Sequence, residues 1–247
     1  IEYHFEGQDL QLLKKGTSSA EPITVAVWLK SNLTGNFNLE IWDRENDRQI
    51  SSALTISSAN TWTKFVKTFA GDTTGALTSD NALRFSIGIW GDSGSTFRGG
   101  TLQTSWGAKT NANRCEGNVN LGNNTANELL VCGLQMEIGS FDENSMPPFQ
   151  HDDTGTSLAR CQRYFISHTV ADGTRLGDGI FRSTTRALGN VDCMGLVPNM
   201  RATPSVATTI TGFAIYHGSD TTTNSNATSG SGFAMNGTQE CRTDFTF

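Results

Sequence analysis

The stretch ITVAVWLKS, residues 23–31, alternates between apolar and other side chains along its whole length. Successive side chains of a β-strand point to opposite faces, so this alternation predicts a strand with one buried face. The buried face would carry the aliphatic side chains Ile23, Val25, Val27 and Leu29. The other face would carry Thr24, Ala26, Trp28 and Lys30.

Three further stretches repeat this alternation: NFNLEIWD (36–43), ALRFSIGIWG (82–91) and LLVCGLQMEIG (129–139). In the last stretch the alternation places five residues on the apolar face, namely Leu130, Cys132, Leu134, Met136 and Ile138. Segments rich in Gly, Asn and Ser separate the predicted strands. Many short strands joined by such turns predict an all-β fold, organised as a β-sandwich.

Three of the predicted strands carry a tryptophan opposite their aliphatic face: Trp28, Trp42 and Trp90. If the aliphatic side chains fill the sandwich, these indoles face outward, and a large outward aromatic is typical of a binding surface. Its cover could be a neighbouring subunit or a second domain. It could also be a sugar, whose apolar ring face stacks on indole while polar side chains bind its hydroxyls. The candidate residues for ligand binding or subunit contact are Trp28, Trp42, Trp90, Glu40 and Arg84; Trp62 and Trp106, in turn-flanked segments, receive no assignment.

The stretch SMPPFQHDDTG, residues 145–155, is rich in proline and aspartate and predicts a linker. Lysine usage changes across it, because every Lys lies at or before Lys109 and the second half uses Arg alone. We therefore expect a sandwich in residues 1–145, a linker with a short helix in 146–165, and a smaller β-domain in 166–247.

The segment TSLARCQRYF, residues 156–165, predicts that short helix, with Ser157 as its cap. Cys161 could act as a nucleophile if His168 served as its base. However, Cys161 falls on the apolar side of the helix, which favours a buried, inert thiol. We therefore interpret the segment as a joint between the two domains, formed by Leu158, Cys161, Tyr164 and Phe165.

The composition excludes several classes of protein. The chain has 247 residues and a net charge of −6, without the clustered Lys and Arg that nucleic-acid binding needs. No apolar stretch approaches the roughly 20 residues that a membrane-spanning helix requires. The five cysteines include no CxxC pair, which argues against a zinc site and favours mostly buried free thiols. Because the chain begins at Ile1 rather than Met, we expect it to be the distal part of a longer or processed polypeptide.

Two stretches contain side chains of the kinds that bind metal ions. DRENDR, residues 43–48, could hold calcium, but a hairpin loop whose charges compensate one another is favoured. QHDD, residues 150–153, is disfavoured because adjacent residues on a proline-flanked loop seldom supply three or four fixed ligands. The sequence contains no nucleophile elbow, HExxH, P-loop or dinucleotide fingerprint. We expect no enzymatic activity, no metal and no cofactor.

Five longer stretches resemble a module that recurs in virion proteins of marine tailed phages. They follow one another along the chain and cover most of residues 5–165. Their first letters are EGQDLQLLKKG (from residue 6), LTISSANTWTK (54), GTLQTSWGAKT (100), NELLVCGLQ (127) and PFQHDDTGTSL (148).

Proteins with this module are usually described as tail fibre, receptor-binding or other virion structural proteins, and the module is similar to carbohydrate-binding jelly rolls. The resemblance implies a jelly-roll sandwich in a homo-oligomer, with a trimer favoured, and no catalytic residues. It also implies a location in the virion and contacts with other virion proteins and a host surface glycan. Two alternatives remain open: a carbohydrate-binding module of a secreted glycan-active enzyme, and a capsid decoration or fibre protein. A depolymerase tailspike is disfavoured because no repeated β-helix rungs are visible.

Overall fold

A computed structural model describes residues 1–165 and Arg201, together with the backbone of six strands in the second half of the chain. Contacts divide the chain into two compact units, Ile1–Gln150 and His151–Phe247, and each is described by itself. Within the described residues, no helix combines the length and the apolar character needed to cross a bilayer.

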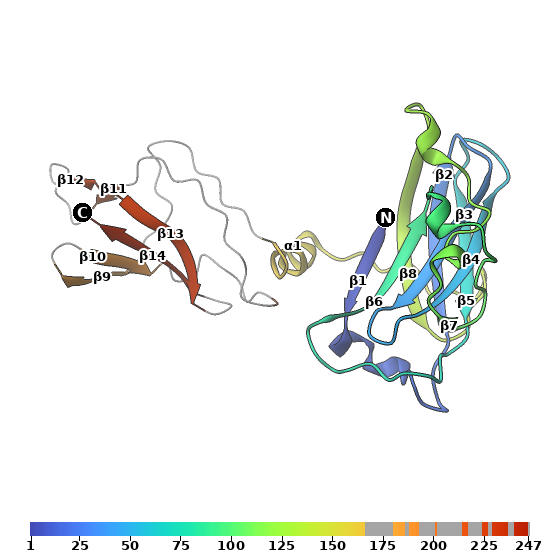
Figure 1. Ribbon diagram of the computed structural model, residues 1–247, viewed down its shortest axis with the longest axis horizontal. Coiled ribbons are helices and arrows are strands. Elements are labelled where there is room, and N and C mark those ends of the chain that lie inside the picture. The colour runs from blue at the N-terminus through green and yellow to red at the C-terminus, as the bar shows by residue number, and fades with distance from the viewer. Residues whose placement is uncertain are drawn as a thin grey trace. The chain divides into compact units, whose positions relative to one another are not determined.

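The first unit is a sandwich of two antiparallel sheets, as Figure 1 shows. The five-stranded sheet has the order β1 (Glu2–Glu6), β6 (Leu83–Trp90), β3 (Gly35–Asp43), β4 (Arg48–Ile56) and β7 (Gly107–Ala108). The three-stranded sheet has the order β5 (Thr63–Phe69), β2 (Ile23–Ser31) and β8 (Leu129–Ile138). Short 3₁₀-helices lie in the connections: η1 (Gly7–Leu13), η2 (Ser95–Phe97), η3 (Asn111–Asn113) and η4 (Leu121–Asn123). The all-β sandwich predicted from the alternation is confirmed.

The core lies between the two sheets and consists of the aliphatic faces that the sequence predicts. Its fully buried members include Val25, Val27, Leu29, Phe37, Leu39, Ile41 and Phe85. Burying a side chain of this size stabilises the fold by about 1.5–3 kcal/mol relative to leaving it exposed. The predicted parity is therefore confirmed for β2 and β3, and for β6 from Phe85 onward; Leu83, expected on the buried face, is 36% exposed at the start of β6.

Strand β8 departs from the predicted parity. Gly133 has a φ of 59°, and the pairing with β2 shifts register between Ala26 and Trp28. This is a β-bulge, which inserts one extra residue and turns the preceding side chains to the opposite face. Leu130 and Cys132 are consequently exposed on the outer face, so their expected place in the core was wrong. Leu134 and Met136 do pack against the core, whereas Ile138 at the end of β8 is 37% exposed, contrary to expectation.

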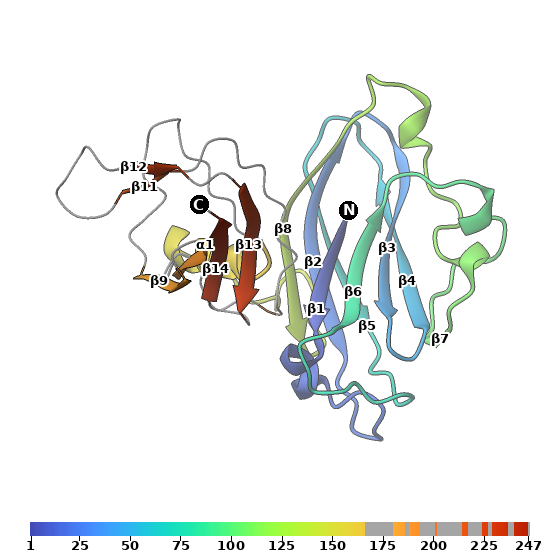
Figure 2. The same ribbon diagram turned by 60° about the vertical axis from the view of Figure 1, so that its left-hand side comes forward.

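The outer faces of the two sheets receive very different cover. The long connection 91–128, between β6 and β8, lies along the outer face of the five-stranded sheet and appears in green beside β4 in Figure 2. Its Gln103 carbonyl accepts a hydrogen bond from Ser51 N at 2.6 Å, and its Glu116 carbonyl accepts one from Asn38 Nδ2 at 3.0 Å.

Within the first unit, residues 139–150 cover one end of the outer face of the three-stranded sheet. Phe141 N donates to Thr24 Oγ1 at 3.1 Å, and Gln135 Nε2 donates to the Pro147 carbonyl at 3.1 Å. Thr24 and Ala26 are buried beneath this segment. At the other end of the face, no segment of the first unit covers Trp28, which is 41% exposed.

The second unit begins with helix α1 (Thr154–Gln162). Its N-cap is Asp153, whose carboxylate accepts a hydrogen bond from Thr156 N at 3.0 Å, so the prediction of Ser157 as the cap was wrong. Asp153 is the better cap because it precedes the helix and its carboxylate can reach the unpaired amide groups of the first turn. All side chains of α1 lie at the surface or near it, and Leu158 is 54% exposed.

The cysteines are less buried than the sequence suggested. Cys161 on α1 and Cys132 on β8 are exposed free thiols, so the expectation of buried thiols was wrong for both. Cys115 is a buried free thiol, and its burial raises the pKa of the thiol. His168, considered as a base for Cys161, lies outside the described residues, as does Cys193.

The rest of the second unit is described as strand backbone. One sheet has the order β13 (Ser229–Asn236), β14 (Glu240–Thr246), β10 (Leu188–Asp192) and β9 (Ile180–Thr185). A second sheet pairs β11 (Ala214–Tyr216) with β12 (Asn224–Asn226). The described part of the second unit therefore consists of antiparallel strands and one short helix.

Candidate functional site

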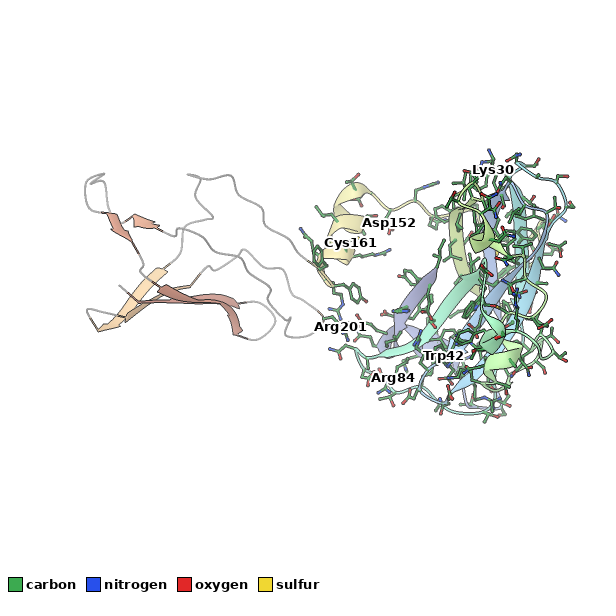
Figure 3. All side chains as sticks on the ribbon, turned by 45° about the horizontal axis from the view of Figure 1, so that its top comes forward. Lys30, Trp42, Arg84, Asp152, Cys161 and Arg201 are labelled. Atoms are coloured by element: carbon green, nitrogen blue, oxygen red, sulfur yellow. The ribbon has the colours of Figure 1, made fainter. Side chains whose placement is uncertain are left out.

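The structure separates the sequence-predicted site residues into two groups. Trp42, Trp90 and Glu40 come together on the outer face of the five-stranded sheet, which we call the closed face. Trp28 lies on the outer face of the three-stranded sheet, whose uncovered end we call the open face. The open face consists of Trp28, Lys30, Trp62, Lys64, Leu130 and Cys132. Figure 3 labels Trp42 and Arg84 on the five-stranded sheet and Lys30 on the three-stranded sheet.

On the closed face, a buried ion pair holds the connection 91–128 against the sheet. Arg114 of this connection donates two hydrogen bonds to the Glu40 carboxylate, from Nε at 2.7 Å and from a terminal nitrogen at 2.8 Å. Trp90 Nε1 donates to the same carboxylate at 2.9 Å. Bidentate bonds between charged groups are among the strongest in proteins. Glu40 therefore has its hydrogen-bonding capacity used inside the molecule.

Cations of the same chain also cover the indole rings of the closed face. The Arg114 guanidinium lies 4.6 Å from the centre of the Trp42 ring and 5.0 Å from that of Trp90. Arg44 and Lys109 lie 3.9 Å and 4.4 Å from the Trp42 ring. These distances are within the range of cation–π attraction. Both indoles face outward as predicted, but the chain itself supplies their cover.

The closed face also buries polar atoms beneath the connection. Gln49 is fully buried, and neither of its amide atoms has a hydrogen-bond partner among the described residues. The same holds for Asn38 Oδ1 and Asn118 Nδ2. A buried polar group without a partner costs about 1–3 kcal/mol. A ligand could reach these atoms only by displacing the connection 91–128.

Arg84 takes no part in either group. It forms ion pairs with Asp80 and Glu45, and the hydrogen bond to Asp80 raises the pKa of Arg84. In Figure 3 its label lies on the same side of the unit as that of Trp42. The contacts of Arg84 nevertheless go to the connection before β6 and to the β3–β4 hairpin, so the structure does not join it to the tryptophans.

The acidic stretch at residues 43–48 forms the β3–β4 hairpin, as predicted. Its charges do not compensate one another, however, because their partners lie elsewhere in the chain. Lys15 Nζ lies 2.5 Å from Asp43 and 3.0 Å from Asp72, and all three side chains are buried. Burial alone would raise the pKa of Asp72, but hydrogen bonds from Arg48 and Lys15 lower it. Among the described residues, no three His, Cys, Asp or Glu side chains gather as metal ligands would.

The open face carries two exposed tryptophans. Trp28 is 41% exposed and lies between Lys64 of β5 and Cys132 of β8 in the pairing register. In the next row, Lys30 lies opposite Leu130, which is also 41% exposed. Trp62 is 42% exposed and comes two residues before Lys64, so strand alternation places it on the same face.

Trp62 is the functional candidate that the sequence analysis missed. It follows a turn and lies just before β5, outside the residues whose apolar and polar side chains alternate. The signal that could have found it is its shared parity with Lys64 and Val66. Trp106, the other unassigned tryptophan, packs against the core and donates a hydrogen bond from Nε1 to the Ala70 carbonyl at 2.6 Å.

The open face is a basic area on an acidic unit. Residues 1–150 contain eleven Lys and Arg against sixteen Asp and Glu, a net charge of −5. Lys14, Lys15 and Lys109 form ion pairs, whereas Lys30, Lys64 and Lys67 form none within the described part of the chain. No Asp or Glu occurs in residues 48–71. The nearest acidic residues in the pairing register are Glu128, beside Asn32, and Glu137, opposite Thr24.

Comparisons with known proteins add no information on function, so the function is argued from the geometry of these two faces. No protein-family model, curated protein or solved structure matches the chain.

Proposed function

We propose that the chain is a non-catalytic, structural and adhesive component of a phage particle, most simply a tail fibre or another appendage. In this proposal the chain assembles as a homo-oligomer, and the oligomer attaches to other virion proteins. Its sandwich is of the jelly-roll type and contacts the host surface. The observation that carries the proposal is the open face, with Trp28 and Trp62 both exposed on one side of a rigid sheet.

The shape of the open face suits adhesion better than chemistry. Contiguous exposed apolar side chains on a soluble protein mark interaction sites. Tryptophan offers a large, rigid contact area with a polar edge, so two of them provide affinity at a low cost in conformational entropy. Trp28 lies on β2 and Trp62 immediately precedes β5, so both are anchored to a sheet, which holds its shape when a ligand binds. Binding through such a face uses stacking and shape rather than bond-making residues.

Exposed apolar side chains in the second unit support the oligomer. Leu158, Tyr164 and Phe165 are 54%, 55% and 73% exposed. In this proposal they form, with Cys161, the joint between domains or between subunits. Symmetric assembly would multiply weak contacts at each open face, and avidity can exceed the affinity of one site by about 10²–10⁴.

Two measurements test the proposal. Light scattering should give a mass near three times the 26.6 kDa of one chain. Antibodies raised against the chain should label the tail appendages of the phage particle in electron micrographs. Label on the capsid would favour the alternative of a capsid decoration or fibre protein. A monomer that is absent from particles and binds soluble oligosaccharide would favour the carbohydrate-binding module of a secreted glycan-active enzyme.

A further inference from the structure

We infer that the open face binds an acidic polysaccharide, with Trp28 and Trp62 stacking on sugar rings and Lys30 and Lys64 pairing with the carboxylates. The inference rests on the proposed adhesive function and names the class of its ligand. It depends on three features of the face: the spacing of the indoles, the lysines without an ion-pair partner among the described residues, and the central strand β2, which is paired on both sides.

The two indoles are placed to contact neighbouring rings of one glycan chain. Trp28 is on β2 opposite Lys64, and Trp62 immediately precedes β5, two residues before Lys64 in the chain. We take the chain at Trp62 as extended in line with β5. Adjacent strands lie about 4.8 Å apart and two residues span about 6.7 Å, which gives a Cα separation of about 8 Å. Gly133 allows the indole of Trp28 to lie close over β8, since a Cβ there would stand 3.2 Å from Trp28 Cδ1.

The charges favour an anionic ligand. Lys64 lies opposite Trp28 in the pairing register. Lys30 follows Leu29, the last residue paired with β5, so the alternation of an extended chain would place Lys30 beside Trp62. Neither lysine forms an ion pair among the described residues. The rest of the unit is acidic, so a polyanion would be repelled elsewhere and oriented toward this face.

A polysaccharide fits the face better than an acidic peptide does. Peptides commonly bind a sheet by adding a strand to its edge, where backbone groups are unpaired. The open face instead centres on β2, whose backbone pairs with both β5 and β8. Over β2 the face therefore offers a ligand side-chain groups only, whereas the edges of this sheet are the outer sides of β5 and β8. Indole faces with ammonium groups match sugar rings that carry carboxylates.

The test uses the full chain and three acidic polysaccharides: alginate, polygalacturonate and hyaluronan. The matched neutral probe is polygalacturonate with its carboxyl groups methyl-esterified. Binding is measured by biolayer interferometry at low and high salt. We expect at least one of the acidic glycans to bind. High salt should weaken that binding several-fold, because screening shortens the reach of charge attraction. Methyl-esterified polygalacturonate should bind several-fold more weakly than the acidic glycan.

Variants assign the binding to the open face. Trp28→Ala should weaken binding at least about tenfold, as for the central aromatic of an interface. The double variant Lys30→Gln and Lys64→Gln should weaken binding several-fold and remove most of its salt dependence. The double variant Lys14→Gln and Lys109→Gln is the matched control, since it removes the same charge at two ion-paired sites away from the face. Circular dichroism confirms that each variant is folded.

Any other outcome overturns the inference. The outcomes below also separate failure of the inference from failure of the proposed function. Equal binding of neutral and acidic glycans, lost in Trp28→Ala, would keep adhesion but reject the acidic ligand. Equal binding of poly-glutamate would show that charge alone suffices. If no acidic glycan binds and Trp28→Ala dissolves the oligomer, the face is a subunit contact and the structural part of the proposed function survives. If no acidic glycan binds and the oligomer is unchanged, the inference also fails.

Discussion

The two outer faces of the sandwich begin from the same sequence pattern and end in opposite states. On the closed face Trp42 and Trp90 are covered by Arg114 and its neighbours in the connection 91–128. On the open face Trp28 and Trp62 remain exposed. Strand parity sets the direction of a side chain, whereas the loops decide whether it stays accessible.

The difference extends to the charges. On the closed face Glu40, Arg114 and Lys109 all have partners, so their charges hold the connection in place. On the open face Lys30 and Lys64 have none among the described residues. Ion pairs and cation–π contacts within the chain stabilise the fold, while unpaired cations beside exposed indoles remain available to a ligand. Variants matched between the two faces can break or sharpen this comparison.

The largest effect is expected from Arg114→Ala on the closed face. Its loss leaves the Glu40 carboxylate buried without its counter-charge, which typically costs about 3–5 kcal/mol in free energy of unfolding. Urea unfolding, read from tryptophan fluorescence, measures the loss. Lys64→Ala on the open face is the matched control and should change stability by less than about 0.5 kcal/mol. Similar losses in both variants would contradict the assignment of the two faces.

A smaller effect is expected from replacing one tryptophan on each face by phenylalanine. Trp90→Phe removes the indole N–H that donates to Glu40, and a hydrogen bond to a charged group contributes about 1.5–3 kcal/mol. Trp28→Phe should stay within about 0.5 kcal/mol of the wild type, because Trp28 is largely outside the core. Chemical unfolding of the two variants provides the measurement. A larger loss for Trp28→Phe would show that the open face is part of the folded core.

The strands and their buried faces could be predicted from the sequence because alternation is a local property. Ile23–Ser31 alternates, and its buried face followed directly. The cover of the faces could not be predicted, because the Glu40–Arg114 pair joins residues 74 positions apart in the chain. Trp42 and Trp90 therefore looked as available as Trp28. No local sequence pattern predicts which cation, distant in the chain, will pack on an indole.

Strand β8 shows a second limit of the pattern. The alternation of LLVCGLQMEIG gives no sign of a bulge except Gly133 itself, and a glycine within a strand has several meanings. One residue out of register moved Leu130 and Cys132 from the predicted core to the open face. The apolar surface beside Trp28 thus depends on a single backbone position.

Gly133→Ala tests that dependence. At a φ of 59° a side chain costs about 1–2 kcal/mol, and the added Cβ would stand 3.2 Å from Trp28 Cδ1. We expect a loss of stability of about that size and an altered environment for the Trp28 indole, read by thermal melting and fluorescence. Gly88→Ala on β6 is the control, since a Cβ there meets nothing closer than 3.8 Å. It should be neutral or stabilising by up to about 1 kcal/mol, and equal losses in both variants would contradict the bulge.

The smallest effect is expected from Glu2→Gln on β1, which is an edge strand of the five-stranded sheet. Burial alone would raise the pKa of Glu2, but hydrogen bonds from Ser86, His4 and Arg44 outweigh it and lower the pKa to about 2. Because the ordinary value is 4.5, the charged form stabilises the fold at neutral pH. That contribution decreases below about pH 4.5 and disappears near pH 2.

Glu2 is partly exposed, so solvent screening limits the contribution to about 1 kcal/mol at pH 7. Urea unfolding of the wild type and Glu2→Gln at pH 7, 4 and 2 should show a difference that falls with pH. Arg44→Gln supplies the matched test, because Arg44 is the cation that holds Glu2 and also covers Trp42. If the pairing is real, the double variant loses less than the two single variants together. A difference that stays constant from pH 7 to pH 2 would instead mean that Glu2 acts through packing, and that charge pairing around the closed face does not extend to β1.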